Sequence, residues 1–428
     1  MTSLLKAKIN NRTANIAVVG LGYVGLPLVS AILNSGYRVY GIDKNIRKIE
    51  ALKMGESYIE NIDEKLLGEA IKNKQFVVGD KFDVLHESDC VLICVPTPLD
   101  ENKTRFDISL LKDAVKEFAD QFRGDQLLII ESTIFPGATR LLQEEFLSQQ
   151  NMKLGENLFV AHSPERVDPG NSKYCVENTD KLVGGLEGNS TELANLFYSN
   201  VLKAKVHQLS KCENVEMTKL LENTYRFINI AFINEFSIYC NQMGYDVKEI
   251  INAAATKPYG FQAFYPGPGI GGHCIPIDPI YLQCVAKETG FSFSFIENAV
   301  EFLKAYREGI VARIKKETHQ NDKILFVGIS YKPQVKDVRE SPTIEMIADL
   351  LKDGYSIDYY DENVEKVNIN GADLFSIQCE TNLEKYKMIV YVHKMNSMTQ
   401  GRLLSSNIKI LDLGYNLNLS NGENIIHP

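Results

Sequence analysis

The segment 264–278, FYPGPGIGGHCIPID, combines a cysteine with a high density of glycine and proline. Cys274 follows Gly271 and Gly272, and a helix-like sequence begins shortly after it. Closely spaced glycines let a backbone approach a ligand, and a helix N-terminus lowers the pKa of a nearby thiol and favours the thiolate nucleophile. We therefore predict a nucleophilic cysteine in a substrate loop, although a typical isolated cysteine would be a packed residue in a turn.

A second candidate group lies on residues 213–243, a stretch without glycine or proline. Lys219 and Asn223 are four residues apart and share one face of a helix, with Glu216 one turn earlier. From spacing alone, a helical lysine is expected to be exposed to solvent. His162 and His273 are expected to be core or hydrogen-bonding histidines, because no cluster has zinc-ligand spacing. No metal site is predicted.

A third group is the pattern of Gly20, Gly22 and Gly25, which follows a strand-like run and opens a helix-like one. Glycines at this spacing allow a tight turn and bring the backbone close to a pyrophosphate at the helix N-terminus. Asp43 comes 18 residues after Gly25, at the end of the next strand-like run. A carboxylate there accepts hydrogen bonds from a ribose 2′-hydroxyl and repels a 2′-phosphate, which favours NAD over NADP.

The elements that must position these groups begin with an alternation of strand and helix. Residues 15–20 and 37–42 are strand-like, and 26–35 between them is helix-like. Further strand candidates are 76–78, 91–95, 127–131 and 158–162. This alternation predicts a parallel sheet with helices on both faces.

The middle of the chain changes to a helical pattern, and the end returns to strands and helices. Residues 213–243 are crowded with apolar side chains and predict a long, largely buried helix. Helical sequence also covers 247–256 and 279–316, and strand-like runs restart at 323–330 and recur at 355–361, 388–393 and 408–413 around a helix at 343–353. The fold class expected is α/β, with two doubly wound Rossmann-like domains at 1–205 and 313–428 joined by a long-helix middle domain at 206–312.

Composition excludes several classes of protein. The net charge of −9 over 428 residues argues against nucleic-acid binding. The polar start of the chain lacks the apolar core of a signal peptide, and no apolar run approaches the ~20 residues of a membrane span. The eight cysteines form no CxxC pair and are expected to be reduced thiols, mostly buried, of a cytoplasmic protein.

Seven motifs in this order resemble the UDP-glucose/GDP-mannose dehydrogenase family of nucleotide-sugar dehydrogenases over essentially the whole chain. They are GLGYVGLPL at 20–28, VPTPL at 95–99, ESTIFPG at 131–137, SPERVDPGN at 163–171, the helix-like run 219–235, GGHCIPIDP at 271–279 and YKPQVKDVRESP at 331–342. The resemblance implies oxidation of a sugar C6 alcohol to a carboxylate with two NAD per substrate, in polysaccharide biosynthesis.

The resemblance also implies roles for individual residues. Cys274 would attack the C6 aldehyde, giving a thiohemiacetal that is oxidised to a thioester, and Lys219 would stabilise the oxyanion. Lys219 or a bound water would help to deprotonate the alcohol. Glu165 and Asp278 would handle protons and the hydrolytic water, Thr133 would order that water, and Asn223 would orient the sugar. Positions implied on the cofactor side are Tyr23, Val24, Lys48, Thr97, Thr133 and Arg339, and on the substrate side Arg166, Tyr265, Gly271 and Lys332.

Two departures from the UDP-glucose enzymes bear on the sugar. Those enzymes have an Asn-Arg pair shortly before the cysteine loop, where this chain has KPYGFQ at 257–262, and a second glutamate where this chain has Pro169 beside Asp168. The chain is most similar to the branch that acts on UDP-N-acetylglucosamine and related N-acetylhexosamines. The alternatives are UDP-N-acetylmannosamine, UDP-N-acetylgalactosamine and UDP-glucose, because a few pocket hydrogen bonds decide between epimers.

Two alternatives from outside this reaction are less consistent with the motifs. A non-catalytic NAD sensor on the same scaffold would be expected to lack Cys274 or Lys219, and both are present. A two-electron dehydrogenase of the 6-phosphogluconate type would not need Cys274. The partners expected are a UDP-sugar substrate and further copies of the chain, in a homodimer or a higher homo-oligomer, since the apolar helix needs more cover than one small domain provides. No nucleic-acid or membrane partner is expected.

Overall fold

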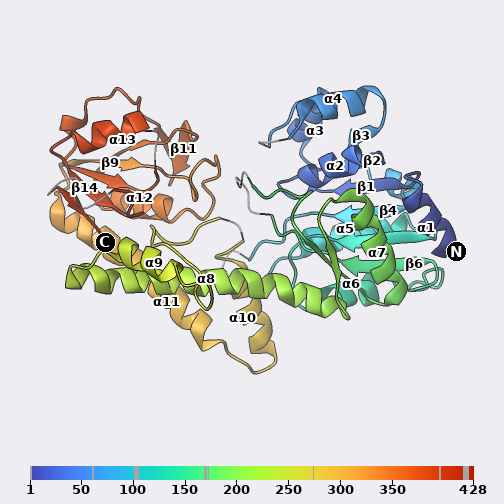
Figure 1. Cartoon of the computed structure of the whole chain (residues 1–428). Helices are drawn as coiled ribbons and strands as arrows, with labels where there is room; N and C mark the ends of the chain where they lie inside the picture. Colours follow the sequence, from blue (N-terminus) through green and yellow to red (C-terminus); the bar gives the residue numbers. More distant parts are fainter. Residues whose placement is uncertain are drawn as a thin grey trace. The chain divides into compact units, whose positions relative to one another are not determined.

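The computed structural model describes residues 2–59, 62–100, 106–167, 171, 173–272, 274–394, 397–417 and 424–428. His273, Asp168 and Pro169, which the sequence analysis singled out, lie outside them. The chain separates into two compact units, Met1–Leu221 and Glu222–Pro428. The long helix α8, Cys212–Met243, contributes residues to both units (Figure 1).

The first unit is built on an eight-stranded sheet in the order β3-β2-β1-β4-β5-β6-β7-β8. All neighbouring strands pair in parallel except β6 and β7, which are antiparallel. The strands are β1 Asn15–Val19, β2 Arg38–Ile42, β3 Phe76–Gly79, β4 Cys90–Ile93, β5 Gln126–Ile130, β6 Leu158–His162, β7 Lys181–Gly185 and β8 Val206–Gln208. The order reverses beside β1, so the sheet is doubly wound, with a ligand crevice expected at the carboxyl ends of β1 and β4.

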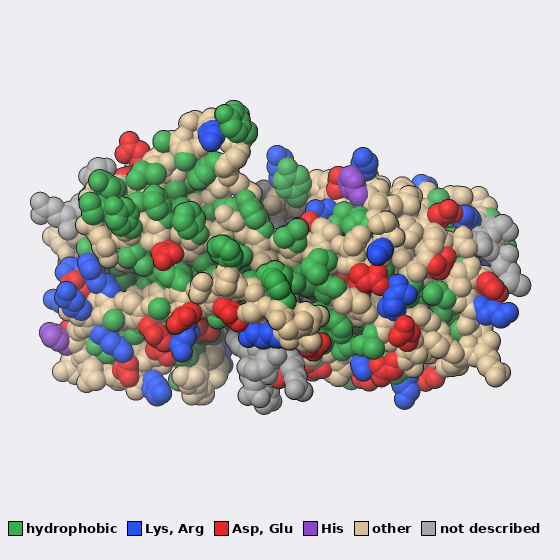
Figure 2. Space-filling model, turned by 90° about the horizontal axis from the view of Figure 1, so that it is seen from below, with side chains coloured by type: hydrophobic (Ala, Val, Ile, Leu, Met, Phe, Trp, Pro, Cys, Tyr) green, Lys and Arg blue, Asp and Glu red, His purple; other side chains and the backbone are tan. Residues whose placement is uncertain are grey.

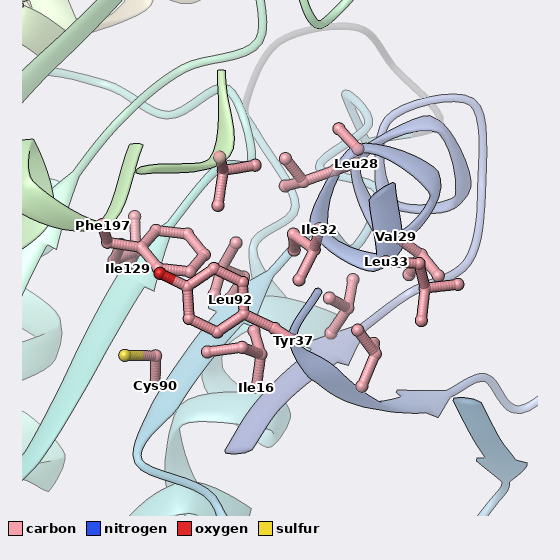
Figure 3. Packing of buried hydrophobic residues seen from close by; sticks show 14 of the residues in the cluster. Ile16, Leu28, Val29, Ile32, Leu33, Tyr37, Cys90, Leu92, Ile129 and Phe197 are labelled. Carbon is pink, nitrogen blue, oxygen red and sulfur yellow. The ribbon is translucent and has the colours of Figure 1, made fainter. Parts of the chain in front are cut away.

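Helices cover both faces of this sheet, and alternate residues of β1 lie in different cores. Ile16 and Val18 belong to one hydrophobic cluster, and Ala17 and Val19 to the other. In the first core, Tyr37 packs with residues of α2 and α7 over the strands (Figure 3). The helices are α1 Thr2–Asn10, α2 Gly25–Asn34, α3 Ile46–Lys53, α4 Glu64–Lys72, α5 Ser109–Asp120, α6 Ala138–Phe146 and α7 Gly188–Val201, with a 3₁₀ turn, η1, at Asp83–Glu87.

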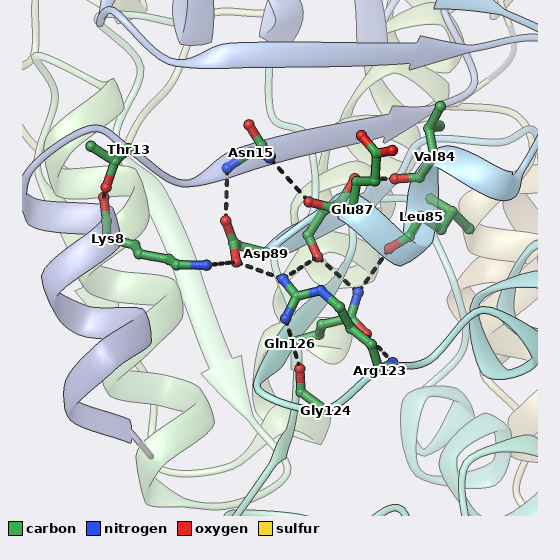
Figure 4. A network of polar contacts seen from close by, with 11 residues as sticks. Lys8, Thr13, Asn15, Val84, Leu85, Glu87, Asp89, Arg123, Gly124 and Gln126 are labelled. Atoms are coloured by element: carbon green, nitrogen blue, oxygen red, sulfur yellow. Dashed lines mark hydrogen bonds and ion pairs between the residues drawn. The ribbon is translucent and has the colours of Figure 1, made fainter.

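A partly buried polar network ties the amino ends of the parallel strands (Figure 4). Asp89, just before β4, accepts hydrogen bonds from the Asn15 N–H at 2.9 Å, from Lys8 Nζ at 2.7 Å and from Arg123 Nη2 at 2.6 Å. Gln126, the first residue of β5, donates to the Leu85 carbonyl at 2.8 Å. Hydrogen bonds therefore connect the loops at this edge, which leaves the carboxyl edge to carry the loops that bind ligands.

The second unit contains a five-stranded parallel sheet in the order β10-β9-β13-β14-β15. Its strands are β9 Lys323–Val327, β10 Ser356–Tyr360, β13 Met388–Tyr391, β14 Lys409–Asp412 and β15 Ile425–Ile426, with a separate hairpin of β11 Lys366–Ile369 and β12 Ala372–Phe375. Its helices, besides part of α8, are α9 Val247–Ala255, α10 Asp278–Glu288, α11 Ser294–Glu317, α12 Pro342–Lys352 and α13 Ser397–Leu404, with the 3₁₀ turn η2 at Leu383–Lys385.

The α/β fold class with two Rossmann-like sheets and a long-helix segment is confirmed. Most expected strands and helices end within two residues of the expected bounds, and the strand expected at 323–330 ends at Val327. The helical stretch 279–316 is interrupted between α10 and α11, because Gly290 adopts a left-handed conformation with φ of 79°. Strand β8, although it starts at the expected beginning of the middle domain, pairs with β7 in the first sheet. The division into three domains at 205 and 312 stays a prediction.

One expectation about α8 is wrong. This helix was predicted to be largely buried, but Tyr225, Phe232 and Tyr239 are 45%, 60% and 54% exposed. They are seven residues apart and form one apolar stripe along the helix. Figure 2 shows hydrophobic side chains gathered over one half of the face it draws. Among the described residues, no helix has the length and apolar character to cross a membrane.

Candidate active site

The glycine turn after β1 has the geometry of a dinucleotide site. Gly20 has φ of 92°, and a Cβ there would lie 2.7 Å from the Cys94 carbonyl oxygen. A Cβ on Gly25 would overlap the Gly20 carbonyl oxygen, so helix and strand pack closely only with glycine. A Cβ on Gly22 would meet no described atom within 4 Å. The first and third glycines thus serve the fold, and Gly22 leaves the backbone open to a pyrophosphate.

Asp43 follows β2 and is fixed beside this turn. Its carboxylate accepts hydrogen bonds from the Leu21 N–H at 2.9 Å and the Asn45 N–H at 2.8 Å. Lys48 Nζ lies 3.2 Å from the same carboxylate and 5.5 Å from the ring centroid of Tyr58. The structure therefore brings together Asp43 and Lys48 at the position where a Rossmann fold holds the adenosine ribose, and the residues fit NAD.

The loops after β4 and β5 are joined at the carboxyl edge of the sheet. Thr97 Oγ1 donates to the Thr133 carbonyl at 2.6 Å. Glu216 of α8 accepts hydrogen bonds from the N–H groups of Gly137 and Thr139, at 2.6 and 2.9 Å, at the N-terminus of α6. Burial raises the pKa of Glu216. From the sequence, Glu216 was noted only as a neighbour of Lys219, and its role in capping α6 was missed.

Glu165 lies three residues beyond β6 and is 13% exposed. One carboxylate oxygen accepts the N–H groups of Arg166 and Val167, both at 2.7 Å, and the other is 3.5 Å from Lys181 Nζ. Burial raises the pKa of Glu165, but Lys181, the two N–H donors and Lys219 outweigh it and hold that pKa below its ordinary value. Glu165 is therefore an ionised carboxylate at neutral pH.

Lys219 is buried, with only 8% of the residue exposed. The expectation of a solvent-exposed helical lysine is therefore wrong, because spacing along a helix does not reveal what packs against it. The electrostatic interaction of Lys219 with Glu165 connects two residues that the family resemblance placed together. Lys181, which the sequence analysis missed, lies in the same cluster.

In the second unit, Asn223 Nδ2 donates to Asp278 Oδ2 at 2.5 Å, and both side chains are buried. Asp278 is the first residue of α10. The N–H groups of Ile277 and Asp278 donate to the Cys274 carbonyl at 3.0 and 2.9 Å, which forms a turn leading into the helix. Cys274 is partly exposed. The structure thus brings together Cys274, Asp278 and Asn223.

The glycines before Cys274 pack against the chain's own segment 331–342. A Cβ on Gly271 would lie 2.8 Å from both the Glu340 carbonyl oxygen and the Tyr331 Cβ, and one on Gly272 2.9 Å from the Tyr331 ring. Gly272 also has φ of 86°. These two glycines are explained by packing within the chain, whereas the sequence interpretation attributed them to ligand approach. Tyr265, in the same loop, donates from its hydroxyl to Asn252 Oδ1 at 2.8 Å.

The turn after β9 repeats the arrangement found after β1. Gly328 has φ of 90°, and the N–H groups of Ile329 and Ser330 donate to Asp361 Oδ2 at 2.8 and 3.2 Å. Asp361 directly follows β10, as Asp43 directly follows β2. Lys332 is partly buried next to this turn, and Arg339 is mostly exposed and pairs with Asp337 at 2.6 Å.

Three family models match this chain: the NAD binding domain of the UDP-glucose/GDP-mannose dehydrogenase family at 14–233, its central domain at 213–303 and its UDP binding domain at 325–409. The chain belongs to the UDP-glucose/GDP-mannose dehydrogenase family. It is therefore an NAD-dependent oxidoreductase of nucleotide sugars, and the prediction of NAD is confirmed at the level of the family. Among the described residues, no three His, Cys, Asp or Glu side chains are grouped as metal ligands.

Named relatives are similar over most of this chain. A UDP-N-acetyl-D-mannosamine dehydrogenase of Methanococcus maripaludis is 34% identical over 82% of this chain and 80% of its own length. A UDP-N-acetyl-D-glucosamine 6-dehydrogenase of Pseudomonas aeruginosa is 32% identical over 81% of this chain and 82% of its own. The solved structure of a UDP-D-ManNAc dehydrogenase from Pyrococcus horikoshii has a TM-score of 0.82 at 28% identity, covering 95% of this chain and 96% of that one.

Proposed function

We propose that this enzyme oxidises the C6 alcohol of a UDP-N-acetylhexosamine to the carboxylate, with two NAD per substrate. The observation that carries the proposal is the placement of Cys274 at the entry to α10, next to the hydrogen-bonded pair Asn223 and Asp278. A simple alcohol dehydrogenase has no use for a thiol there, whereas oxidation beyond the aldehyde requires a nucleophile that holds the carbonyl carbon.

The sugar we place first is UDP-N-acetylmannosamine. Relatives named for it are up to 35% identical to this chain and come from Methanococcus maripaludis, Methanocaldococcus jannaschii and Pyrococcus horikoshii. UDP-N-acetylglucosamine, which the motifs favour, is the second candidate, supported by the Pseudomonas aeruginosa relative. The two substrates differ only at C2, so hydrogen bonds around that carbon would discriminate between them.

The first oxidation converts the C6 alcohol into the aldehyde. Bound NAD would accept a hydride in each of the two oxidations. As the hydride leaves C6, the hydroxyl proton passes to a water that Lys219 holds, while the Lys219 ammonium stabilises the developing alkoxide. The burial of Lys219 supports this role, because a desolvated ammonium close to the reacting oxygen strongly stabilises an alkoxide.

The second oxidation runs through Cys274. Its thiolate attacks the aldehyde carbon, and Lys219 stabilises the oxyanion of the thiohemiacetal. Loss of the second hydride leaves a thioester. Water then adds to the thioester carbonyl with Glu165 taking its proton, and the Cys274 thiolate leaves. The lowered pKa of Glu165 supports this step, because a general base must be ionised.

The remaining residues have binding roles in this proposal. Thr133 orders the hydrolytic water, and Asn223 and Asp278, already hydrogen-bonded to each other, orient the sugar and transfer protons. Cofactor-binding positions are Gly20, Gly22, Tyr23, Val24, Gly25, Asp43, Lys48, Thr97, Thr133 and Arg339. Substrate-binding positions are Glu165, Arg166, Lys219, Asn223, Tyr265, Gly271 and Lys332.

We also propose three domains, for NAD at 1–205, for dimerisation at 206–312 and for the UDP-sugar at 313–428. The exposed stripe of α8 supports a homodimer formed through the middle domain. A cytoplasmic location stays a prediction.

The test is the yield of NADH per substrate across UDP-N-acetylmannosamine, UDP-N-acetylglucosamine, UDP-N-acetylgalactosamine and UDP-glucose. We expect two NADH for each molecule of the preferred N-acetylhexosamine consumed. Cys274→Ala should lose turnover and still bind NAD and UDP-sugar, and Cys274→Ser should at most form a slowly hydrolysed ester. Exposed Cys175→Ala is the matched control and should retain activity. Near wild-type formation of two NADH by Cys274→Ala would disprove the covalent mechanism.

A further inference from the structure

Lys181 is a buried lysine for which the proposed reaction has no role. Only 3% of the residue is exposed, and its ammonium lies 2.6 Å from Glu131 Oε2 and 3.5 Å from Glu165 Oε2. A lysine is almost never buried to this degree unless it is paired, because an isolated buried charge is very costly. A single cation is thus shared between a core carboxylate and a carboxylate of the candidate active site.

The topology of the sheet explains how Lys181 reaches this position. Strand β7 runs antiparallel to β6, with Ala161 opposite Gly185 and His162 opposite Gly184. Continuing this register by three residues places Glu165 opposite Lys181. The first residue of β7 therefore lies at the carboxyl edge of the parallel strands, where ligands bind. Lys181 Nζ also donates to the Pro164 carbonyl at 3.1 Å, so it contacts both the side chain of Glu165 and the backbone before it.

Glu131 competes with Glu165 for the Lys181 charge. It directly follows β5, is buried, and also accepts a hydrogen bond from the Tyr198 hydroxyl of α7. Burial raises the pKa of Glu131. Burial lowers the pKa of Lys181, but the two carboxylates outweigh it and the net pKa is raised, so Lys181 is charged. The other titratable or charged groups around Glu165 and its partners are Lys219 on α8, Cys94 after β4, His162 on β6, Tyr198 on α7 and the neighbouring Arg166.

We propose that Lys181 is a positioning residue that holds Glu165 in place and ionised for hydrolysis of the thioester, and that Glu131 sets how much of the Lys181 charge Glu165 receives. This inference rests on the proposed role of Glu165 as the base. Lys181 acts through Glu165, and the competing account is that Lys181 only neutralises Glu131 in the core.

The two accounts differ in the pH profile of kcat. Glu131→Gln is nearly isosteric and leaves Lys181 with Glu165 as its carboxylate partner, so the acidic limb of the profile should move to lower pH. Lys181→Met removes the cation, so the acidic limb should move up by about one pH unit or more. The double variant Lys181→Met/Glu131→Gln, which buries no unpaired Glu131 charge, should keep this upward shift. Lys181→Arg should restore the limb toward the wild-type position, and the KM for NAD should stay unchanged throughout.

The inference would be overturned if the acidic limb of the kcat profile lay at the wild-type pH both in Glu131→Gln and in the double variant. Lys181 would then be a core residue that only neutralises Glu131. If the variants lacking Lys181 fail to fold, Glu131→Gln decides alone: an unchanged limb overturns the inference and a downward shift supports it. Glu165→Gln separates this inference from the proposed function. If Glu165→Gln retains the wild-type acidic limb, Glu165 is not the base, and the proposed mechanism fails whatever Lys181 does.

Discussion

Asp43 and Lys48 form an ion pair whose two members favour different cofactors. The carboxylate repels a 2′-phosphate, whereas the ammonium, 3.2 Å away, would attract one. In Asp43→Ala the repulsion disappears and Lys48 loses its partner. We expect kcat/KM for NADP, divided by kcat/KM for NAD, to rise about tenfold or more. This is the size of effect expected when one close charge interaction is gained. Steady-state kinetics with both cofactors measures this ratio.

The matched control is the double variant Asp43→Ala/Lys48→Ala. It should accept NADP less well than Asp43→Ala, because the cation that favours the phosphate is gone. If wild-type enzyme already used NADP as efficiently as NAD, the assigned role of Asp43 would be wrong.

His162, at the end of β6, is buried and links stability to pH. Burial and the positive charge of Lys181 lower the pKa of His162 to about 3. The unfolded chain protonates this residue near its ordinary value of 6.5, so unfolding takes up a proton at any pH between the two values. The stability that depends on neutral His162 is therefore present above pH 6.5 and is lost as the pH falls from 6.5 toward 3.

In the wild type, the free energy of unfolding should fall as the pH is lowered from 6.5 to 5. We expect His162→Leu to make this fall shallower by up to ~1.4 kcal/mol per pH unit. Urea unfolding at a series of pH values measures the difference from wild type. His319→Leu, which removes an exposed histidine and leaves the buried site as it is, is the matched control. A slope equal to wild type in His162→Leu would contradict the buried neutral histidine.

At the scale of elements, the sequence predicts those features whose residues are close together along the chain. The turn with Gly20 and Gly25 and the carboxylate of Asp43 were predicted because strand, turn, helix and acidic residue are adjacent in sequence. Strand β7 was not predicted, because five residues with two glycines carry little strand signal. Its partner β6 ends at His162, well before β7 begins at Lys181, so no short turn marks the pairing. The pairing of Lys181 with Glu165 depends on that strand, so it could not be found from the sequence.

The cysteine loop shows the same limit. Its glycines were noticed, but their neighbour in space, Tyr331, lies about sixty residues further along the chain. Packing against a distant segment and approach to a ligand both require glycine, so the pattern alone does not distinguish them.

Two glycines of this loop therefore differ in tolerance to alanine. In Gly271→Ala the added Cβ would lie 2.8 Å from the Glu340 carbonyl oxygen, which belongs to the backbone and yields little. We expect a loss of about 1–3 kcal/mol in the free energy of unfolding, with a drop in kcat because Cys274 is three residues away. In Gly267→Ala, the Cβ meets no described atom within 4 Å, and the change should stay within about 0.5 kcal/mol. Urea unfolding and steady-state kinetics measure both effects, and equal stability of the two variants would contradict this packing.

At the scale of the whole molecule, the same glycine turn with an aspartate acceptor occurs in both units. In each unit a glycine with positive φ ends the first strand, and the following N–H donates to an aspartate after the next strand, Leu21 to Asp43 and Ile329 to Asp361. Both α/β patterns were predicted from the sequence, but Asp361 was not singled out, because the second turn lacks the three-glycine spacing. The NAD-binding and UDP-binding family models fall on these two repeats.

The exposed apolar stripe of α8 predicts an interface between two copies of the chain. Large hydrophobic side chains exposed in register along a helix favour burial against a partner, and the two-fold related copy of the same helix presents a complementary stripe. We expect light scattering to give twice the 48.2 kDa chain mass. Phe232→Glu places a charge in the middle of the stripe and should shift the enzyme toward monomer. Phe375→Glu makes the same substitution at an equally exposed phenylalanine on β12, outside α8, and should leave the dimer intact. A wild-type enzyme that is monomeric at working concentration, or a dimer unaffected by Phe232→Glu, would show that this stripe is not the interface.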